Sequence, residues 1–384
     1  MKKSNLYLVF LMALIVMSCS KDETTMSIPQ ESNAIEFGTY VGRGAQTRAT
    51  VIDVNNLPTL GFGVFAYYTD GAGYSDNSSS GSTPNFMYNT KVSGENWIYS
   101  PIKYWPNETT DKLTFFAYAP YSDGTQNNIS SFSGNTVTGD PTLKFTVNGV
   151  VKEQTDLLYA DPTNLKDLGK QSIVGKVLFP FKHALSRIGF KVEVMADKVN
   201  DDATGTNDDG SIVSDDIASG TVVSVQKVEL IGKFVNSNTF NFAKNTWATP
   251  TDMTADDYAY SLNYNETEAS SDFVNTVANT VTTTATKLNA DDSYLMIIPK
   301  TFATGDLLKI RVTYTVTTTD SNLASSSVIT NVITSEQFAF SFVAGKAYTF
   351  NLHLGMTSVK FDATVTGWDG VTPETVVNVS INTN

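Results

Sequence analysis

The chain has very little of the residue types that build redox, metal and nucleophilic sites. Its 384 residues include one cysteine, Cys19, so no disulfide can form within the chain. The two histidines, His183 and His353, belong to no H-E-x-x-H motif, and neither a G-x-S-x-G motif nor a P-loop is present. We therefore predict no catalytic residue, no metal ligand and no cofactor.

Positive charge is also scarce, with 26 Lys and Arg residues against 39 Asp and Glu residues and a formal net charge of −13. The sequence contains no basic cluster. An acidic chain repels phosphate backbones and anionic lipid surfaces. We therefore expect no nucleic-acid partner.

Two segments resemble binding motifs but are better explained as a strand and a loop. GFGVFA at 61–66 matches G-x-G-x-x-A, but a dinucleotide site needs a strand before this motif and a helix after it, whereas the segment itself reads as a strand. The acidic segment 196–220 lacks the D-x-[DN]-x-[DN]-G spacing of a calcium loop. We interpret it as a solvated loop between two strands.

The N-terminus has the layout of a secretory leader. Two lysines precede an apolar run from Leu6 to Met17, which is too short for a permanent membrane-spanning helix. A small serine and Cys19 end the run, and VMSC resembles a lipobox, in which cleavage precedes a cysteine modified by diacylglycerol and palmitate. We predict a signal peptide over 1–18 and lipidation of Cys19. An ordinary leader with an incidental cysteine is the alternative.

The residues after Cys19 are polar and patternless as far as residue 34, which is typical of a tether. The first of them, SKDE at 20–23, resembles a short acidic signal that sends some bacterial lipoproteins to the cell surface. A solvated linker is the alternative. The resulting expectation is a surface-exposed protein of the cell outer membrane.

The rest of the chain reads as many short strands with turn residues between them and almost no helical periodicity. AIEFGTYV at 34–41 is the first strand, with Ile35, Phe37 and Val41 on one side. Similar runs include GFGVFAYY, KLTFFAYAP, KVLFPF, RIGFKVEVM, SYLMIIPK and LLKIRVTYTVTT. This pattern predicts an all-β fold of two tandem β-sandwich domains, residues 49–181 and 182–384, with the boundary near Phe181.

Aromatic residues gather in NWIYSPIKYWP, which contains Trp97, Tyr99, Tyr104 and Trp105. Large rings most often fill the core of a β-sandwich. Exposed aromatic platforms also bind sugars. An unprocessed, glycan-binding surface lipoprotein therefore stays open as an alternative function.

Arginine is rare, and Arg43 and Arg48 lie together in the glycine-bearing loop GRGAQTRAT after the first strand. Accessible loops are preferred sites of proteolytic nicking. Arg187 and Arg311 fall inside strand-like runs, where a protease cannot reach the backbone. Cleavage between Arg48 and Ala49 would separate the lipidated tether and first strand, residues 19–48, from the remainder. Chance clustering of the two arginines is the alternative.

The C-terminus also reads as a strand, because Val377, Val379 and Ile381 alternate with polar residues in ETVVNVSINTN. Termini are usually frayed and polar. A final strand of this quality raises the question of whether its partner belongs to the same molecule.

Taken in order, these segments resemble the fimbrillin family, the type V pilins of oral and gut Gram-negative anaerobes. The resemblance spans most of the chain. It is carried by the leader ending at Cys19 and by AIEF before TRAT, LGFGVFAYY, WIYSPIKYWP, LTFFAYAPY, FPFKHALSRIGFKV, AGKAYTFNLHL and ATVTGWDG.

The resemblance implies two tandem transthyretin-like β-sandwiches made as a surface lipoprotein. It further implies that an arginine-specific protease removes the first strand, by cutting at Arg48–Ala49 or after Arg43. A terminal strand of a neighbouring subunit then replaces it. The expected partners are other pilin subunits, the outer membrane before processing, and a host or bacterial surface ligand. The expected final location is the fimbrium.

Overall fold

The computed structural model describes residues 33–41, 52–75, 81–170, 175–194, 221–264, 271–273, 280–281, 284–290, 293–319, 325–355, 359–368 and 375–377. Among these residues, no helix is long and apolar enough to cross a membrane. Helical structure in this part of the chain is limited to single turns: α1 (Leu57–Leu60), η1 (Val151–Glu153) and η2 (Pro162–Asn164). The prediction of an all-β sandwich fold is confirmed.

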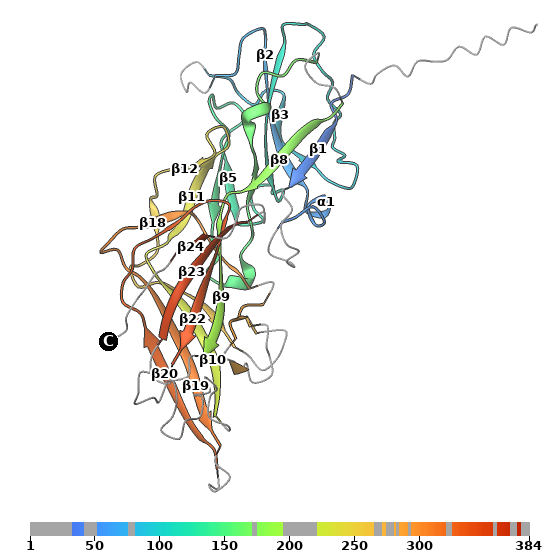
Figure 1. The fold of residues 1–384 in the computed structure, drawn as a ribbon. Coiled ribbons are helices and arrows are strands. Elements are labelled where there is room, and N and C mark those ends of the chain that lie inside the picture. The colour runs from blue at the N-terminus through green and yellow to red at the C-terminus, as the bar shows by residue number, and fades with distance from the viewer. Residues whose placement is uncertain are drawn as a thin grey trace, which may run out of the picture. The chain divides into compact units, whose positions relative to one another are not determined.

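The first six-stranded sheet contains the N-terminal strand at one edge (Figure 1). Its order is β1 (Phe37–Val41), β8 (Val177–His183), β7 (Leu158–Ala160), β4 (Lys112–Ala119), β2 (Phe62–Thr69) and β3 (Met87–Val92). β1 and β8 run parallel, and the other neighbours in this sheet run antiparallel.

A second sheet joins strands from both halves of the sequence. Its order is β12 (Thr246–Trp247), β11 (Val235–Asn241), β6 (Thr142–Thr146) and β5 (Ile129–Phe132), and β13 (Asp252–Met253) also pairs with β11. β11 therefore pairs with a strand that precedes Phe181 although it follows this residue by more than fifty positions in the sequence. The division of the chain into domains at Phe181 stays a prediction.

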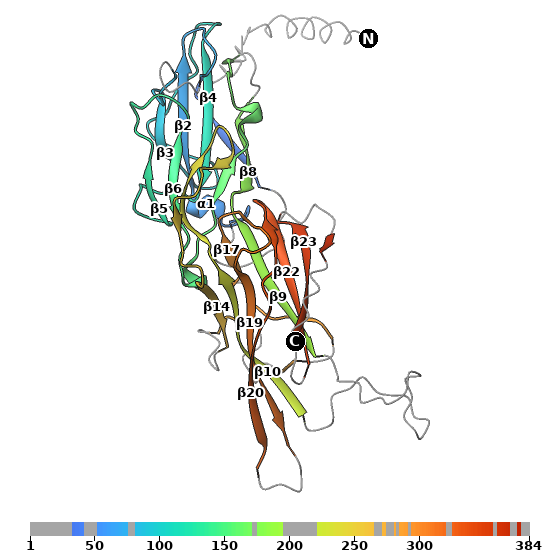
Figure 2. The same cartoon turned by 90° about the vertical axis from the view of Figure 1, so that its left-hand side faces the viewer.

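The remaining strands form two larger sheets and a two-stranded ladder (Figure 2). One sheet has the order β14 (Ala259–Asn263), β10 (Thr221–Gly232), β19 (Leu308–Thr318) and β20 (Ser327–Thr334), with β15 (Thr280–Val281) on β10. The other has the order β16 (Thr286–Lys287), β9 (Ser186–Val194), β22 (Lys346–Leu354), β23 (Val359–Gly367) and β24 (Thr375–Val377), with β17 (Leu295–Ile297) on β9. β18 (Lys300–Phe302) pairs with β21 (Phe340–Phe342).

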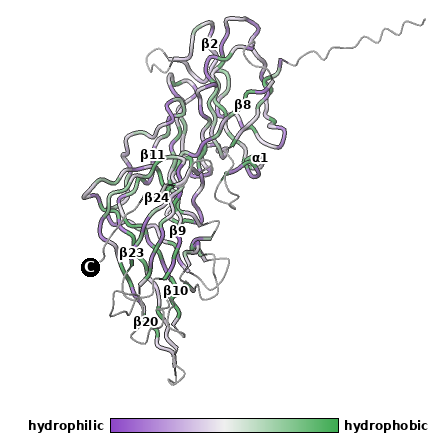
Figure 3. The backbone as a smooth tube through the Cα atoms, viewed as in Figure 1, coloured by the Kyte–Doolittle hydropathy of each residue, from purple (hydrophilic) through white to green (hydrophobic). Residues whose placement is uncertain are grey.

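β2 and β4 are buried on both faces, which explains why their sequences are apolar at nearly every position. Phe65 and Phe116 point into the larger of two cores, which continues through the sheets of β10 and β22. Phe62 and Phe115 point into a smaller core that also takes side chains of β1 and β8. Along the half-buried strands, hydrophobic and hydrophilic residues alternate, and Figure 3 shows the two kinds interspersed.

Candidate functional site at the edge strand

Strand β1 occupies the edge of its sheet and pairs with β8 alone among the described strands. In the parallel register, Phe37 lies opposite Val177 and Val41 lies opposite Phe181. An edge strand of this kind is held by one ladder of backbone hydrogen bonds instead of two. Its removal would leave the N–H and C=O groups along one side of β8 without partners.

The apolar side chains of β1 and of the residues just before it are buried in the smaller core. Ile35, Phe37 and Val41 are all buried there. The Phe37 ring lies among aromatic neighbours, with its centroid 5.1 Å from that of Tyr99 and 6.0 Å from that of Phe115. The strand thus fills a groove lined by aromatic side chains. The predicted placement of the three residues on one face agrees with this burial.

The segment NWIYSPIKYWP forms part of the same groove. The Ile35 N–H donates a hydrogen bond to the Lys103 carbonyl at 2.9 Å, and the Tyr99 hydroxyl donates to the Ile35 carbonyl at 2.7 Å. Tyr99 and Trp105 are buried in the core that contains β1. Trp97 is partly buried against the same core, whereas Tyr104 is 60% exposed.

The opposite side of β1 faces solvent. Tyr40 is 63% exposed, and Glu36 forms an exposed ion pair with Lys176 at 3.7 Å. Exposed ion pairs contribute little to stability. β1 is therefore held in place by its buried apolar side chains and by its backbone hydrogen bonds to β8.

The processing and lipidation residues predicted from the sequence, Cys19, Arg43, Arg48 and Ala49, lie outside the described residues. The described chain resumes at Ile52, whose N–H donates a hydrogen bond to the buried carboxylate of Asp156 at 3.2 Å.

The other two arginines lie in strands, as expected. Arg187 in β9 stacks over the Tyr294 ring, with its guanidinium carbon 4.5 Å from the ring centroid. Arg311 in β19 pairs with Glu229.

The predicted donor strand is described only at its start. β24 pairs antiparallel with β23 of the same chain, where Val377 lies opposite Ala363. β24 is the last strand in the order of its sheet. The other two donor residues, Val379 and Ile381, lie outside the described residues, as does the acidic segment 196–220.

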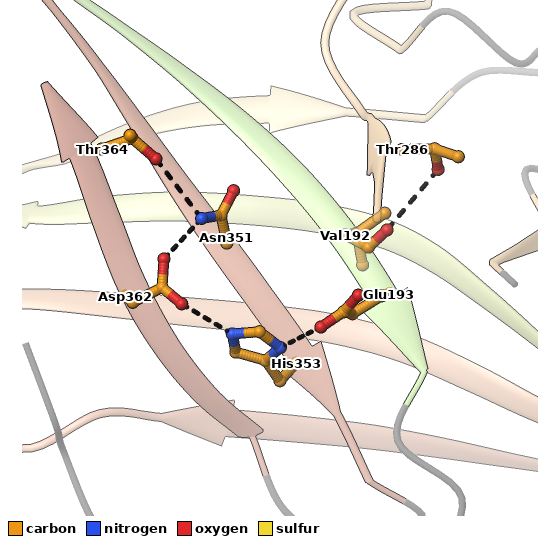
Figure 4. Close-up of polar contacts among 7 residues, drawn as sticks. All are labelled: Val192, Glu193, Thr286, Asn351, His353, Asp362 and Thr364. Carbon is orange, nitrogen blue, oxygen red and sulfur yellow. Dashed lines mark hydrogen bonds and ion pairs between the residues drawn. The ribbon is translucent and has the colours of Figure 1, made fainter. Parts of the chain in front are cut away.

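A polar cluster on the outer face of the sheet of β22 escaped the sequence analysis. His353 lies between two carboxylates, with Nδ1 2.5 Å from Glu193 Oε1 and Nε2 3.0 Å from Asp362 Oδ2 (Figure 4). Asn351 donates hydrogen bonds to Asp362 and, at 3.4 Å, to the Thr364 hydroxyl. The cluster ties β9, β22 and β23 together.

The sequence carries no local signal for this cluster because its members come from strands far apart in the sequence. The parallel register places His353 opposite Glu193, whereas Asp362 lies on the antiparallel neighbour β23. Within the described residues, no group of three or more His, Cys, Asp or Glu side chains is arranged to hold a metal ion. The arrangement serves as a bridge between strands.

His183 forms a second, buried polar contact. Its Nδ1 lies 2.8 Å from Asp156 Oδ2, and its ring stacks on Trp368 with centroids 4.2 Å apart. Asp156 also accepts the hydrogen bond from Ile52. The contact therefore links β8 to the residues that follow the arginine-containing loop and to the segment after β23.

Residues 47–368 match the fimbrillin-like family. The chain is 29% identical over 383 residues to the fimbrium subunit Fim1C of Phocaeicola vulgatus, covering 94% of this chain and 95% of that protein. The crystal structure of a fimbrial protein from Bacteroides vulgatus ATCC 8482 superposes with a TM-score of 0.67 at 26% identity, covering 87% of this chain and 99% of that chain. Because the family match spans well over half of the sequence, the chain belongs to the fimbrillin-like family.

Proposed function

We propose that the protein is a fimbrial subunit that assembles by donor-strand exchange, in which a strand of a neighbouring subunit replaces β1. The observation that carries this proposal is the position of β1, whose apolar row fills an aromatic groove while a single ladder binds its backbone. The match to a fimbrillin-like family supports a fimbrial role, and it covers residues 47–368, which begin after β1 and end before β24. Both strands that exchange requires lie outside the matched range.

Export and anchoring come first in this scheme. Lipidation of Cys19 holds the precursor at the outer membrane, exposed on the cell surface. Labelling with an alkyne fatty acid should tag the wild type and leave the Cys19→Ala variant untagged. Equal labelling of the two would refute the anchor.

Proteolysis then releases β1. An arginine-specific protease cuts at Arg48–Ala49, or after Arg43, in the segment between β1 and Ile52. Before the cut, β1 occupies its groove at the high effective concentration of a covalent neighbour, which keeps the precursor from polymerising. After the cut this advantage is lost, and a strand of the next subunit can enter.

The donor in the proposal is the C-terminal tail, whose Val377, Val379 and Ile381 repeat the alternate apolar positions of β1 and whose β24 must leave its pairing with β23 to enter the groove. Burial of such a side chain contributes about 1.5–3 kcal/mol as an upper estimate, and the backbone of β8 regains its ladder. β24, the described start of the donor, and β1 lie in different sheets of the subunit. The contact is therefore heterologous and propagates into a filament.

The test is to treat the precursor with an arginine-specific protease and to look for ladders by electrophoresis without boiling. Val379→Asp places a carboxylate in an apolar groove and should abolish the ladder. Ser380→Asp, on the other face of the tail, is the matched control and should polymerise. Arg48→Ala combined with Arg43→Ala should leave the precursor intact. If Val379→Asp polymerises as well as the wild type, the tail is not the donor.

A second candidate function, glycan binding by an unprocessed surface lipoprotein, is favoured by one observation. Tyr104 is exposed, and so are two apolar residues of the same segment, Ile98 and Ile102. Sequencing the N-terminus of the protein taken from the cell surface separates the two functions. Processing predicts Ala49 or Gly44 as the first residue, whereas the alternative predicts an N-terminus blocked at Cys19.

A further inference from the structure

Strand β20 is a second edge that the fimbrial proposal does not use. It stands last in its sheet and pairs with β19 in an unbroken antiparallel register, from Arg311 opposite Thr334 to Thr318 opposite Ser327. No other strand in the described part of the chain pairs with it. Figures 1 and 2 show β19 and β20 running side by side.

β20 carries exposed apolar side chains on both faces of the strand, between polar Ser, Thr and Asn residues. Val328 and Val332 are 60% and 61% exposed and lie opposite Thr317 and Thr313, on the face away from the core. Ile329 lies opposite the buried Val316, on the core-facing row, and is nevertheless 59% exposed. Ile333, further along the same row, packs against the larger core, so the strand extends beyond the core on the side of Ile329.

The usual protection of an edge strand is missing here. Exposed edges are normally blunted by Lys, Pro, a β-bulge or inward-pointing charge. Residues 321–335, SNLASSSVITNVITS, contain no charged residue and no proline, and the β19–β20 register shows no shift. This neutrality stands out in a chain with a net charge of −13. Two acidic copies that repel each other elsewhere can approach along this edge.

We propose that β20 binds β20 of a second copy of this chain, in an antiparallel pair around a two-fold axis at Thr330. Opposite residues of antiparallel strands share a face of the sheet. Centring the pair on Thr330 places Val328 of each copy opposite Val332 of the other. The spacing of the two valines is thus self-complementary, and each pair covers side chains that are exposed in the single chain.

This contact differs from strand exchange in its symmetry. An isologous contact uses the same surface on both subunits and closes at two copies, whereas donor-strand exchange is heterologous and propagates. In a fimbrium the β20 pair would join two subunits in addition to the head-to-tail contacts. It does not depend on cleavage, so the uncleaved chain suffices to test it.

The first experiment measures association of the uncleaved chain, recovered from the cell surface in detergent, by sedimentation velocity over a range of concentrations. The wild type should form a dimer. Val332→Lys should weaken the dimer by roughly tenfold or more, because the two-fold axis places the new charge in the contact twice. Val150→Lys is the matched control, since Val150 is 55% exposed and lies outside β20, and it should dimerise like the wild type.

The second experiment tests the register. Thr330→Cys places one thiol of each copy across the axis, so mild oxidation should give a disulfide-linked dimer. Thr317→Cys, one strand away on β19, should give no such dimer. The wild type, oxidised in parallel, shows whether Cys19 forms any disulfide-linked dimer by itself. A wild type that stays monomeric, or a dimer that survives Val332→Lys, overturns the proposal. Absence of the Thr330→Cys cross-link in a dimeric sample overturns the pairing centred on Thr330.

Discussion

Phe37 in β1 packs against Phe179 in β8, with ring centroids 5.3 Å apart and ring planes inclined by 34°. The contact joins the first strand to β8, which the four other strands of the same sheet separate from it in the sequence. Both rings lie in the smaller core. Any release of β1 must break this contact.

Replacing Phe37 with alanine should therefore destabilise the uncleaved precursor. Truncating a buried phenylalanine costs about 3–5 kcal/mol of the free energy of unfolding. Urea denaturation measures the loss. Tyr40→Ala, on the exposed side of the same strand, should change the free energy of unfolding by about 0.5 kcal/mol or less. Equal losses for the two variants would contradict the assignment of the groove.

Gly63 in β2 permits a close approach that no larger residue allows. A Cβ atom at this position would lie 2.3 Å from the Tyr118 ring and 2.7 Å from the Asn89 side-chain oxygen. The Tyr118 hydroxyl is held 2.7 Å from that oxygen, so the ring cannot move away freely. Gly63→Ala should lower the free energy of unfolding by about 1–3 kcal/mol through overpacking.

Gly38 in β1 supplies the matched control for this prediction. Its added Cβ would meet only the end of the exposed Leu178 side chain at 2.7 Å, which can rotate away. Thermal unfolding of Gly38→Ala should therefore resemble that of the wild type. A larger loss of stability for Gly38→Ala than for Gly63→Ala would contradict the prediction that the contact with Tyr118 is the more costly of the two.

The pair between Glu229 and Arg311 should make stability depend on acid pH. Arg311 donates to both carboxylate oxygens, at 2.6 and 2.8 Å, and lowers the pKa of Glu229 from 4.5 to about 2. A carboxyl with a lowered pKa in the folded state stabilises the protein above its ordinary pKa of 4.5. This contribution is lost as the pH falls from 4.5 towards 2.

Glu229→Gln should remove that contribution and flatten the pH dependence of stability in this window. It should also lower the free energy of unfolding at neutral pH by about 1.5–3 kcal/mol, as expected for hydrogen bonds to a charged group. Denaturant titrations from pH 6 to pH 2 measure both effects. Parallel stability curves for the variant and the wild type would refute the prediction.

His353→Ala should loosen the outer strands of its sheet. The substitution removes the ring between Glu193 and Asp362, and the loss of its two hydrogen bonds should cost about 1–3 kcal/mol. Faster hydrogen exchange of the β23 amides is the expected signature. Lys360→Ala is the control, because Lys360 lies opposite His353 in the register but is exposed. Unchanged exchange in His353→Ala would mean that the cluster does not hold these strands.

The sequence by itself determined the all-β class, many of the strands and the buried face of the first strand. A strand repeats every two residues, so the pattern AIEFGTYV requires Phe37 and Tyr40 to point to opposite sides whatever the strand pairs with. The structure agrees, with Phe37 buried and Tyr40 exposed. The order of the apolar motifs was also enough to predict membership of the fimbrillin family, which the family match confirms.

Only the tertiary structure decided which strands are neighbours. The period of two residues is the same for every strand, so it does not show that β1 pairs parallel with β8 or that β11 pairs with β6. The same limit applies to the cluster around His353, because Glu193 reaches it through the register between β9 and β22. Partner and register are set by the packing of distant side chains against one another, and that information is not local to any segment of the sequence.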